Sequence, residues 1–155
     1  SAQNIGSVFS RGVESSITGE ILDSLMMIRC AYTRQLATDE SPGSITAGNI
    51  LPTIPQELFS VALSYKFGEK TTFGGSCTYS SFRYYTADNS PEYLLPSYGL
   101  VTVYGEHTIA LVGSIAALRL ECSNLLNTSY SVIINYPMPT RSFRLGLRMI
   151  FSDTE

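Results

Sequence analysis

Charge is scarce in this chain. Of its 155 residues only 15% are Asp, Glu, Lys or Arg, whereas about 25% is typical of soluble domains. The formal net charge is −3 and the sequence has no basic cluster, so it predicts no nucleic-acid partner. No apolar run approaches the length of about 18 residues that a membrane-spanning helix needs. Membrane-spanning strands remain open, because each carries only a half-apolar signal.

Residues that bind metals or catalyse reactions are also few. The chain has a single histidine, His107. It has three cysteines without a C-x-x-C pair, Cys30, Cys77 and Cys122. This pattern predicts neither a disulfide framework nor a zinc site, and we interpret the cysteines as small apolar residues of strands. Because no nucleophile has a base at a recognisable spacing, we expect no enzyme activity, no metal and no cofactor.

What the chain has in abundance is segments in which apolar and polar residues alternate one by one. From Phe143 to Phe151 every second residue is apolar, and Arg144 and Arg148 lie between them. Just upstream, Arg119 and Glu121 alternate with leucine and cysteine. Only a strand has this period. Each strand therefore has an apolar and an ionic face, as in a soluble sandwich with its ionic face in water or a membrane barrel with its apolar face in lipid.

The same alternation predicts seven strands. They lie at 8–22, 25–35, 58–67, 71–84, 98–107, 111–124 and 142–151. In the fifth, the apolar face is ambiguous, because Leu100 and Tyr104 compete with Val101 and Val103. The connections alternate between short ones and long ones, the latter at 36–57, 85–96 and 125–141. Outer-membrane barrels have short periplasmic turns and long extracellular loops, so this regularity favours a barrel over a sandwich.

Two motifs near the C-terminus resemble those of a known family. Asn124-Leu-Leu-Asn-Thr-Ser-Tyr130 is followed by Tyr136-Pro-Met-Pro-Thr-Arg141 and by a last strand with an aromatic residue near its end. This order is similar to the end of TonB-dependent outer-membrane receptors. Leu126 stands where that family usually has Phe, Thr140 stands where it usually has Gly, and Ser152 to Glu155 follow the usual terminal aromatic. Asn4-Ile-Gly with Arg11-Gly-Val-Glu14 resembles an internal barrel strand of the same family.

The resemblance implies an all-β fold, an antiparallel transmembrane β-barrel segment of about seven strands. It would be the C-terminal third of a barrel of about 22 strands with a plugged lumen. Residues 1–155 would then be the C-terminal β-barrel portion of an outer-membrane receptor, without its plug domain. An open sheet leaves two edges that lipid does not tolerate. We therefore expect another polypeptide, or another part of the same one, to supply the remaining strands and the plug.

The implied function is active uptake of a scarce, bulky ligand such as a metal chelate, haem, cobalamin or an oligosaccharide. Energy would come from the TonB complex, acting indirectly through the plug. The location would be the bacterial outer membrane, with extracellular long loops and a periplasmic C-terminus. Lipid or lipopolysaccharide and a surface lipoprotein are further candidate partners. Two alternatives stay open: a small self-contained outer-membrane barrel, and a soluble β-sandwich that acts as a binding module.

Candidate site residues follow from this placement. The charged wall facing the lumen would comprise Glu14, Glu20, Arg29, Lys66, Arg119, Glu121, Arg144 and Arg148. It would act as a cross-strand ladder that holds the register, or as a surface that docks the plug or guides the substrate. Tyrosines at strand ends are typical of an aromatic girdle, and four beside the loops are candidate ligand contacts: Tyr84, Tyr85, Tyr93 and Tyr136. The barrel-closing strand would present Phe143, Leu145, Leu147, Met149 and Phe151 on its apolar face. Arg11, on the apolar side of the first strand, suits an interfacial position.

Overall fold

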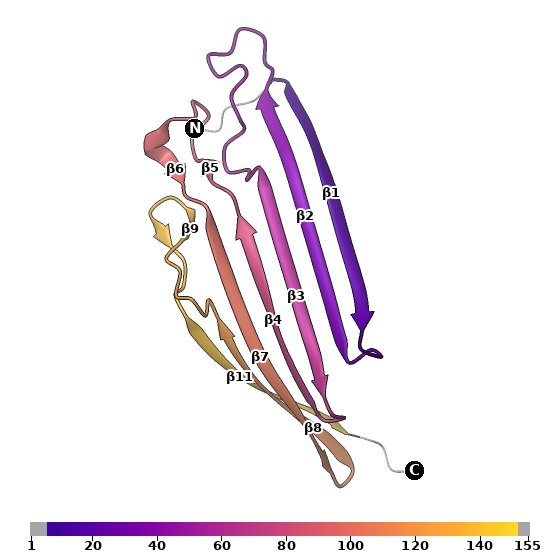
Figure 1. The fold of residues 1–155 in the computed structure, drawn as a ribbon. Coiled ribbons are helices and arrows are strands. Elements are labelled where there is room, and N and C mark those ends of the chain that lie inside the picture. Colours follow the sequence, from indigo (N-terminus) through magenta and orange to yellow (C-terminus); the bar gives the residue numbers. More distant parts are fainter. Residues whose placement is uncertain (1–5, 152–155) are drawn as a thin grey trace.

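The computed structural model describes residues 6–151, which form one antiparallel sheet of seven strands (Figure 1). The strands are β1 (Val8–Ile21), β2 (Met26–Asp39), β3 (Glu57–Phe67), β4 (Thr71–Ser80), β7 (Tyr98–Leu111), β8 (Ser114–Ser123) and β11 (Ser142–Phe151). They are adjacent in the sheet in this same order. β1 and β11 are the two edges and do not pair with each other within residues 6–151, so the barrel is not closed in this chain.

Three long connections lie at one end of the sheet and three short turns at the other (Figure 1). We call residues 40–56, 81–97 and 124–141 the first, second and third loop. The second loop holds the short strands β5 (Arg83–Tyr84) and β6 (Leu94–Leu95) and the 3-10 helix η1 (Pro91–Tyr93). The third holds β9 (Ser131–Ile133) and β10 (Tyr136–Pro137). In the described part of the chain, no helix has the length and hydropathy needed to cross a membrane.

All seven predicted strands are present, but several predicted ends were wrong. β2 continues to Asp39, and β4 ends at Ser80 instead of residue 84. β7 continues to Leu111, which had been assigned to the next strand, so His107 lies inside β7 instead of at its predicted end. β7 continues because apolar and polar residues still alternate between His107 and Leu111. The turn that follows is marked in the sequence by a single glycine. That residue, Gly113, has a φ of 68°, which glycine adopts without strain.

Some predicted features lie outside the described residues. These are Asn4 and Ile5 of the N-terminal motif and the last four residues, 152–155, including the C-terminus that we expected on the periplasmic side.

The strand register separates two faces. Directly opposed residues of antiparallel strands share a face. One row across all seven strands reads Glu20, Met27, Ser64, Gly74, Tyr104, Glu121 and Arg144, and we call its side of the sheet the polar face. The adjacent row reads Ile21, Met26, Tyr65, Phe73, Gly105, Leu120 and Leu145 and belongs to the apolar face. The ambiguity in β7 is thereby resolved, with Val103 on the apolar face and Tyr104 on the polar face.

Within residues 6–151, nothing packs against the apolar face. Ile17 is 71% exposed and Phe143 is 72% exposed, and among residues 6–151 no large side chain is fully buried. Soluble monomers rarely expose a continuous apolar patch larger than a few hundred Å². A soluble β-sandwich would cover this face with a second sheet, whereas the other sheets among residues 6–151 are two-stranded ones within the second and third loops. The face therefore requires an apolar environment outside the chain.

Candidate functional site

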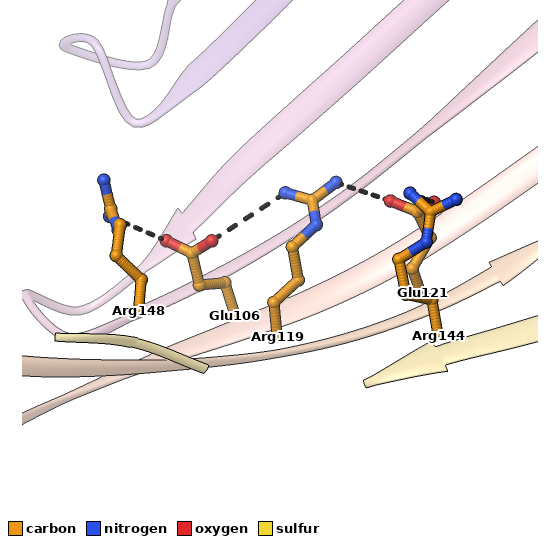
Figure 2. Close-up of polar contacts among 5 residues, drawn as sticks. All are labelled: Glu106, Arg119, Glu121, Arg144 and Arg148. Atoms are coloured by element: carbon orange, nitrogen blue, oxygen red, sulfur yellow. Dashed lines mark hydrogen bonds and ion pairs between the residues drawn. The ribbon is translucent and has the colours of Figure 1, made fainter. Parts of the chain in front are cut away.

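Five charged side chains form a cluster on the polar face of β7, β8 and β11 (Figure 2). Arg119 is central, with one guanidinium nitrogen 2.9 Å from a Glu121 carboxylate oxygen and another 3.8 Å from Glu106. Arg144 lies 3.7 Å from Glu121, and Arg148 lies 3.7 Å from Glu106. The register accounts for this proximity, since Glu106 opposes Arg119 and Glu121 opposes Arg144. This ion cluster has three cations and two anions, so one positive charge remains in excess.

An aromatic ring also holds the central arginine. The guanidinium carbon of Arg119 is 3.7 Å from the centroid of the Tyr104 ring, which is a cation–π contact. Tyr104 in turn packs over Gly74 of β4, where an added Cβ would lie 2.5 Å from the ring. A glycine is therefore required at position 74 by the close approach of the ring, a common use of glycine inside strands.

Sequence reasoning named four of the five cluster members and missed Glu106, together with Tyr104. Both lie on β7, whose alternation was ambiguous. The signal that could have found Glu106 is the excess of cations over anions in the predicted wall. The other predicted wall residues, Glu14, Glu20, Arg29 and Lys66, share the polar face but are spread over β1, β2 and β3. Within residues 6–151 none of these four takes part in an ion pair.

A strip of small side chains separates these two groups. Ala62, Ser64, Ser76 and Thr102 line a hollow of about 320 Å³ on the polar face. Arg29 borders it on the β2 side, and Tyr104, Arg119 and Glu121 border it on the other. Small residues leave room for another chain segment to approach the backbone. The wall therefore has one charged region and one region that is open to close contact.

The first and second loops are hydrogen-bonded to each other. The side-chain oxygen of Asn89 accepts a 2.8 Å hydrogen bond from the N–H of Ile50, and its Nδ2 donates to the carbonyl of Ile50 at 2.8 Å. Asn49 Nδ2 donates to the carbonyl of Ala87 at 3.0 Å. These contacts join residues nearly forty positions apart, so neither loop can be ordered in this way without the other.

Asp39 closes the first loop on itself. Its carboxylate accepts hydrogen bonds from the N–H of Ser41 at 2.9 Å and from the hydroxyls of Ser44 at 3.1 Å and Thr46 at 2.6 Å. The hydrogen bonds from Ser41 and Thr46 lower the pKa of Asp39 to about 2, because they stabilise the charged form. Asp39 is the last residue of β2 at the loop end, five residues beyond Arg34, which interrupts the apolar face, and so lies outside the segment that would span a membrane.

Arg83 ties the second loop to the third. It is only 4% exposed, and its Nη2 donates to the carbonyls of Ser131 at 3.0 Å and Val132 at 3.3 Å. Its guanidinium carbon is 5.5 Å from the centroid of the Tyr98 ring, which lies 4.6 Å from the ring of Tyr130. The three loops are thus one connected structure, which we call the loop cap.

The two C-terminal motifs form the base of the third loop. Buried Asn124 accepts from the N–H of Thr128 at 2.8 Å and donates to its carbonyl at 2.8 Å. Asn127 accepts a 3.0 Å hydrogen bond from the N–H of Arg141, whose Nε donates to the carbonyl of Leu125 at 2.8 Å. The Asn and Arg residues of the motifs therefore join the two ends of the loop.

All four candidate ligand-loop tyrosines lie in the loop cap. Tyr84, Tyr85 and Tyr93 belong to the second loop, where the N–H of Tyr85 donates to the carbonyl of Tyr93 at 3.1 Å. Tyr136 lies on the third loop, at the start of β10. Tyr93 and Tyr136 have exposed side chains. Their contact with a ligand stays a prediction.

The apolar face carries the cysteines and the candidate closing residues. Cys30, Cys77 and Cys122 are free and lie on this face of β2, β4 and β8. On β11, Phe143, Leu145, Leu147, Met149 and Phe151 are exposed along the sheet edge. His107 lies on the same face of β7, with a ring nitrogen 2.8 Å from the hydroxyl of Thr71. Residues 6–151 contain no group of three or more His, Cys, Asp or Glu side chains able to hold a metal ion.

Comparison with known proteins points to one family. The family described as TonB dependent receptor-like, beta-barrel matches residues 1–125. An uncharacterized TonB-dependent receptor of Haemophilus influenzae is 25% identical, with coverage of 83% of this chain and 39% of the relative. The chain therefore spans less than half the length of this relative.

Solved structures show the same fold. The unliganded ferric citrate transporter FecA has a TM-score of 0.83 and 16% identity, covering 92% of this chain and 24% of that one. BauA, the ferric preacinetobactin receptor of Acinetobacter baumannii, has a TM-score of 0.78 and 17% identity, covering 89% and 21%. The ferric-catecholate import receptor Fiu of Escherichia coli K12 has a TM-score of 0.69 and 20% identity, covering 90% and 20%. Because the family match extends over residues 1–125 and most of the chain superposes on receptor barrels, this chain belongs to the TonB-dependent receptor β-barrel family.

Proposed function

We propose that this chain forms the C-terminal wall and loop cap of a TonB-dependent transporter that takes up a scarce, bulky ligand. The observation that carries the proposal is the open sheet with an uncovered apolar face, an ion cluster on its polar face and three interlocked loops at one end. Family membership and fold indicate the bacterial outer membrane. In this arrangement the apolar face contacts lipid, the polar face lines the lumen, the loop cap is extracellular and the short turns are periplasmic.

The rest of the barrel and the plug come from another polypeptide or from another part of a longer chain. The edges of β1 and β11 expose backbone N–H and C=O groups that lipid cannot satisfy, so further strands must pair with them. TonB acts indirectly through the plug. Lipopolysaccharide around the barrel and a surface lipoprotein on the loop cap are further partners in this proposal.

The polar face then serves as the inner wall. The eight wall residues and Glu106 face the plug or the passing substrate. The ion cluster, with its one excess positive charge, favours a plug surface that carries carboxylates, and the hollow beside it accommodates a close backbone approach. The cross-strand ladder that holds the register is the same cluster, so both roles use the same residues.

Among the ligand classes, a ferric chelate is the first to test. FecA, BauA and Fiu are named for ferric citrate, ferric preacinetobactin and ferric catecholate. Haem, cobalamin and oligosaccharides are the other members of the proposed class. Uptake of radioactive iron from a panel of ferric chelates should fall to background when the gene is deleted and when TonB is deleted. Equal uptake in all strains would contradict an iron-chelate function for this receptor.

The organisation of the barrel is tested by mass spectrometry of the detergent-solubilised native complex, both folded and unfolded. We expect this sequence to be found with, or within, a larger polypeptide that carries a plug and about fifteen further strands. A species of this chain alone, with heat-modifiable migration, would favour the small self-contained barrel. If the chain is soluble without detergent, the result would favour the soluble binding module.

A further inference from the structure

Two arginines interrupt the apolar face near the loop end of β1 and β2. Arg11 opposes Leu36, and Val13 opposes Arg34, so the two arginines are diagonal neighbours about 7–8 Å apart. Both side chains are exposed. Within residues 6–151 neither forms an ion pair, unlike the arginines of the ion cluster.

The carboxylates near this arginine pair are engaged by hydroxyl groups. Glu57 opposes Arg34 across β2 and β3, and its carboxylate accepts a 3.2 Å hydrogen bond from the hydroxyl of Tyr32. The Glu57 carboxylate is thereby engaged with a neighbour on its own face. Glu40, just beyond the end of β2, likewise accepts a 3.0 Å hydrogen bond from the hydroxyl of Thr38. Because neither carboxylate forms an ion pair with Arg11 or Arg34 in the described residues, both guanidinium groups remain available to an anion from outside the chain.

The distance of Arg11 from the short turns places it at the level of the lipid headgroups on the loop side. From Ile21, beside the short turn, to Arg11 is ten residues, or about 33 Å at about 3.3 Å per residue. Strands of outer-membrane barrels are tilted by about 35–45° from the barrel axis. The projection of this strand length on the axis is therefore about 25 Å, which is the height of the apolar band of such barrels. Below Arg11 the same face carries Val13, Ile17 and Ile21. A charged side chain is costly at the middle of this band and tolerated at its rim.

A hollow adjoins the two arginines. It has a volume of about 360 Å³ and is lined by Arg11, Arg34, Leu36 and Gln56, among others. Gly12, between Arg11 and Val13, also lines it and adds no side chain to the hollow. A guanidinium pair beside such a hollow offers several N–H donors to one tetrahedral anion.

We propose that Arg11 and Arg34 bind the phosphate of a lipid headgroup in the leaflet on the loop side of the membrane. Guanidinium groups bind phosphate oxygens in a bidentate manner, and the acyl chains of the same lipid would lie along Val13 and Ile17. On the proposed function, from which this inference takes its membrane and orientation, the leaflet is the outer one and the lipid is lipopolysaccharide. The surface therefore selects a lipid that is both phosphorylated and anchored.

The test uses the complete receptor, purified from its own outer membrane and stripped of lipid. Diphosphoryl lipid A, dephosphorylated lipid A and inorganic phosphate are added separately, and native mass spectrometry measures the bound lipid. We expect diphosphoryl lipid A to bind at least tenfold more tightly than the dephosphorylated form. Arg11→Gln combined with Arg34→Gln should remove this preference, whereas Arg144→Gln combined with Arg148→Gln on the polar face should keep it. Equal binding by the first double variant and the unchanged receptor would overturn the proposal.

Two further readouts separate the possible failures. If inorganic phosphate raises the thermal midpoint as much as diphosphoryl lipid A does, the pair is a free-anion site and the lipid proposal fails. Ile45 in the first loop is fully exposed, so Ile45→Cys should react with a membrane-impermeant maleimide on intact cells. Absence of labelling would overturn the orientation in the proposed function. Labelling without preference for the phosphorylated lipid would overturn only the inference about Arg11 and Arg34.

Discussion

Tyr104 lies between Arg119, 3.7 Å from its ring centroid, and Gly74, on which it packs. These three residues belong to β4, β7 and β8, so a side-chain contact couples strands that the backbone ladder already joins. A shift of register by one residue would turn Tyr104 to the other face. The contact therefore supports the register of the central strands as well as the position of the ion cluster.

Replacing Gly74 should disturb this contact. In Gly74→Ala the new Cβ would lie 2.5 Å from the Tyr104 ring, so the ring must shift and its contact with Arg119 is disturbed. We expect the free energy of unfolding to fall by about 0.5–2 kcal/mol, the range of a cation–π contact. Gly146→Ala is the matched control on the same face, because its Cβ would meet its nearest neighbour at 4.0 Å. Urea unfolding of the complete receptor in lipid measures both, and equal effects would contradict the role of position 74.

Glu121 should matter more to stability than the exposed arginine it binds. Its side chain is 16% exposed and contacts both Arg119 and Arg144. Glu121→Gln should lower the free energy of unfolding by about 1–3 kcal/mol, because the partly buried Arg119 loses its nearest charged partner. Arg144 is 80% exposed, and Arg144→Gln should cost about 0–1 kcal/mol. Denaturant unfolding of the two variants tests the order, and a larger effect at Arg144 would show that Glu121 does not anchor the cluster.

The first loop should resist acid down to an unusually low pH. An unperturbed aspartate has a pKa of about 3.9, whereas that of Asp39 is about 2 because of hydrogen bonds from Ser41 and Thr46. Because the folded pKa is lowered, the stabilisation is fully present above about pH 4. It is lost as the pH falls through about 2.

Pepsin, which is active in this range, provides the measurement. We expect the first loop to resist cleavage at pH 4 and to be cleaved at pH 2. Asp39→Asn removes the charge, so the first loop of this variant should be cleaved at pH 4 as well as at pH 2. A loop that opens near pH 4 in the unchanged receptor would show that Asp39 does not hold it.

Arg83 and Asn89 should control different halves of the loop cap. Arg83→Lys keeps the charge but loses the paired donation to the carbonyls of Ser131 and Val132, so amides of the third loop should exchange faster. Asn89→Ala removes both hydrogen bonds to Ile50, so amides of the first loop should exchange faster instead. Hydrogen exchange followed by mass spectrometry distinguishes these opposite patterns. The same pattern in both variants would mean that the cap opens only as a whole.

Local features of the chain predicted the strands and their faces well. Alternation is a property of successive residues, so β3 and β11 were located almost to the residue. It failed in β7, where Tyr104 and the valines compete, because an amphipathic Tyr suits either face. The end of the same strand was misplaced because a single glycine, Gly113, is a weak turn signal when alternation continues up to it.

The sequence by itself determined an antiparallel sheet of seven two-faced strands, alternating loop lengths and the C-terminal motifs. Each of these depends on residues close together in the chain. Only the tertiary structure decided which side chains meet. Arg148 reaches Glu106 across the intervening strand, where small, buried Ala117 opposes Arg148. Arg83 meets Ser131, nearly fifty residues away, only when the second and third loops have folded together. Such contacts depend on register and loop docking, which are set by the packing of the whole sheet.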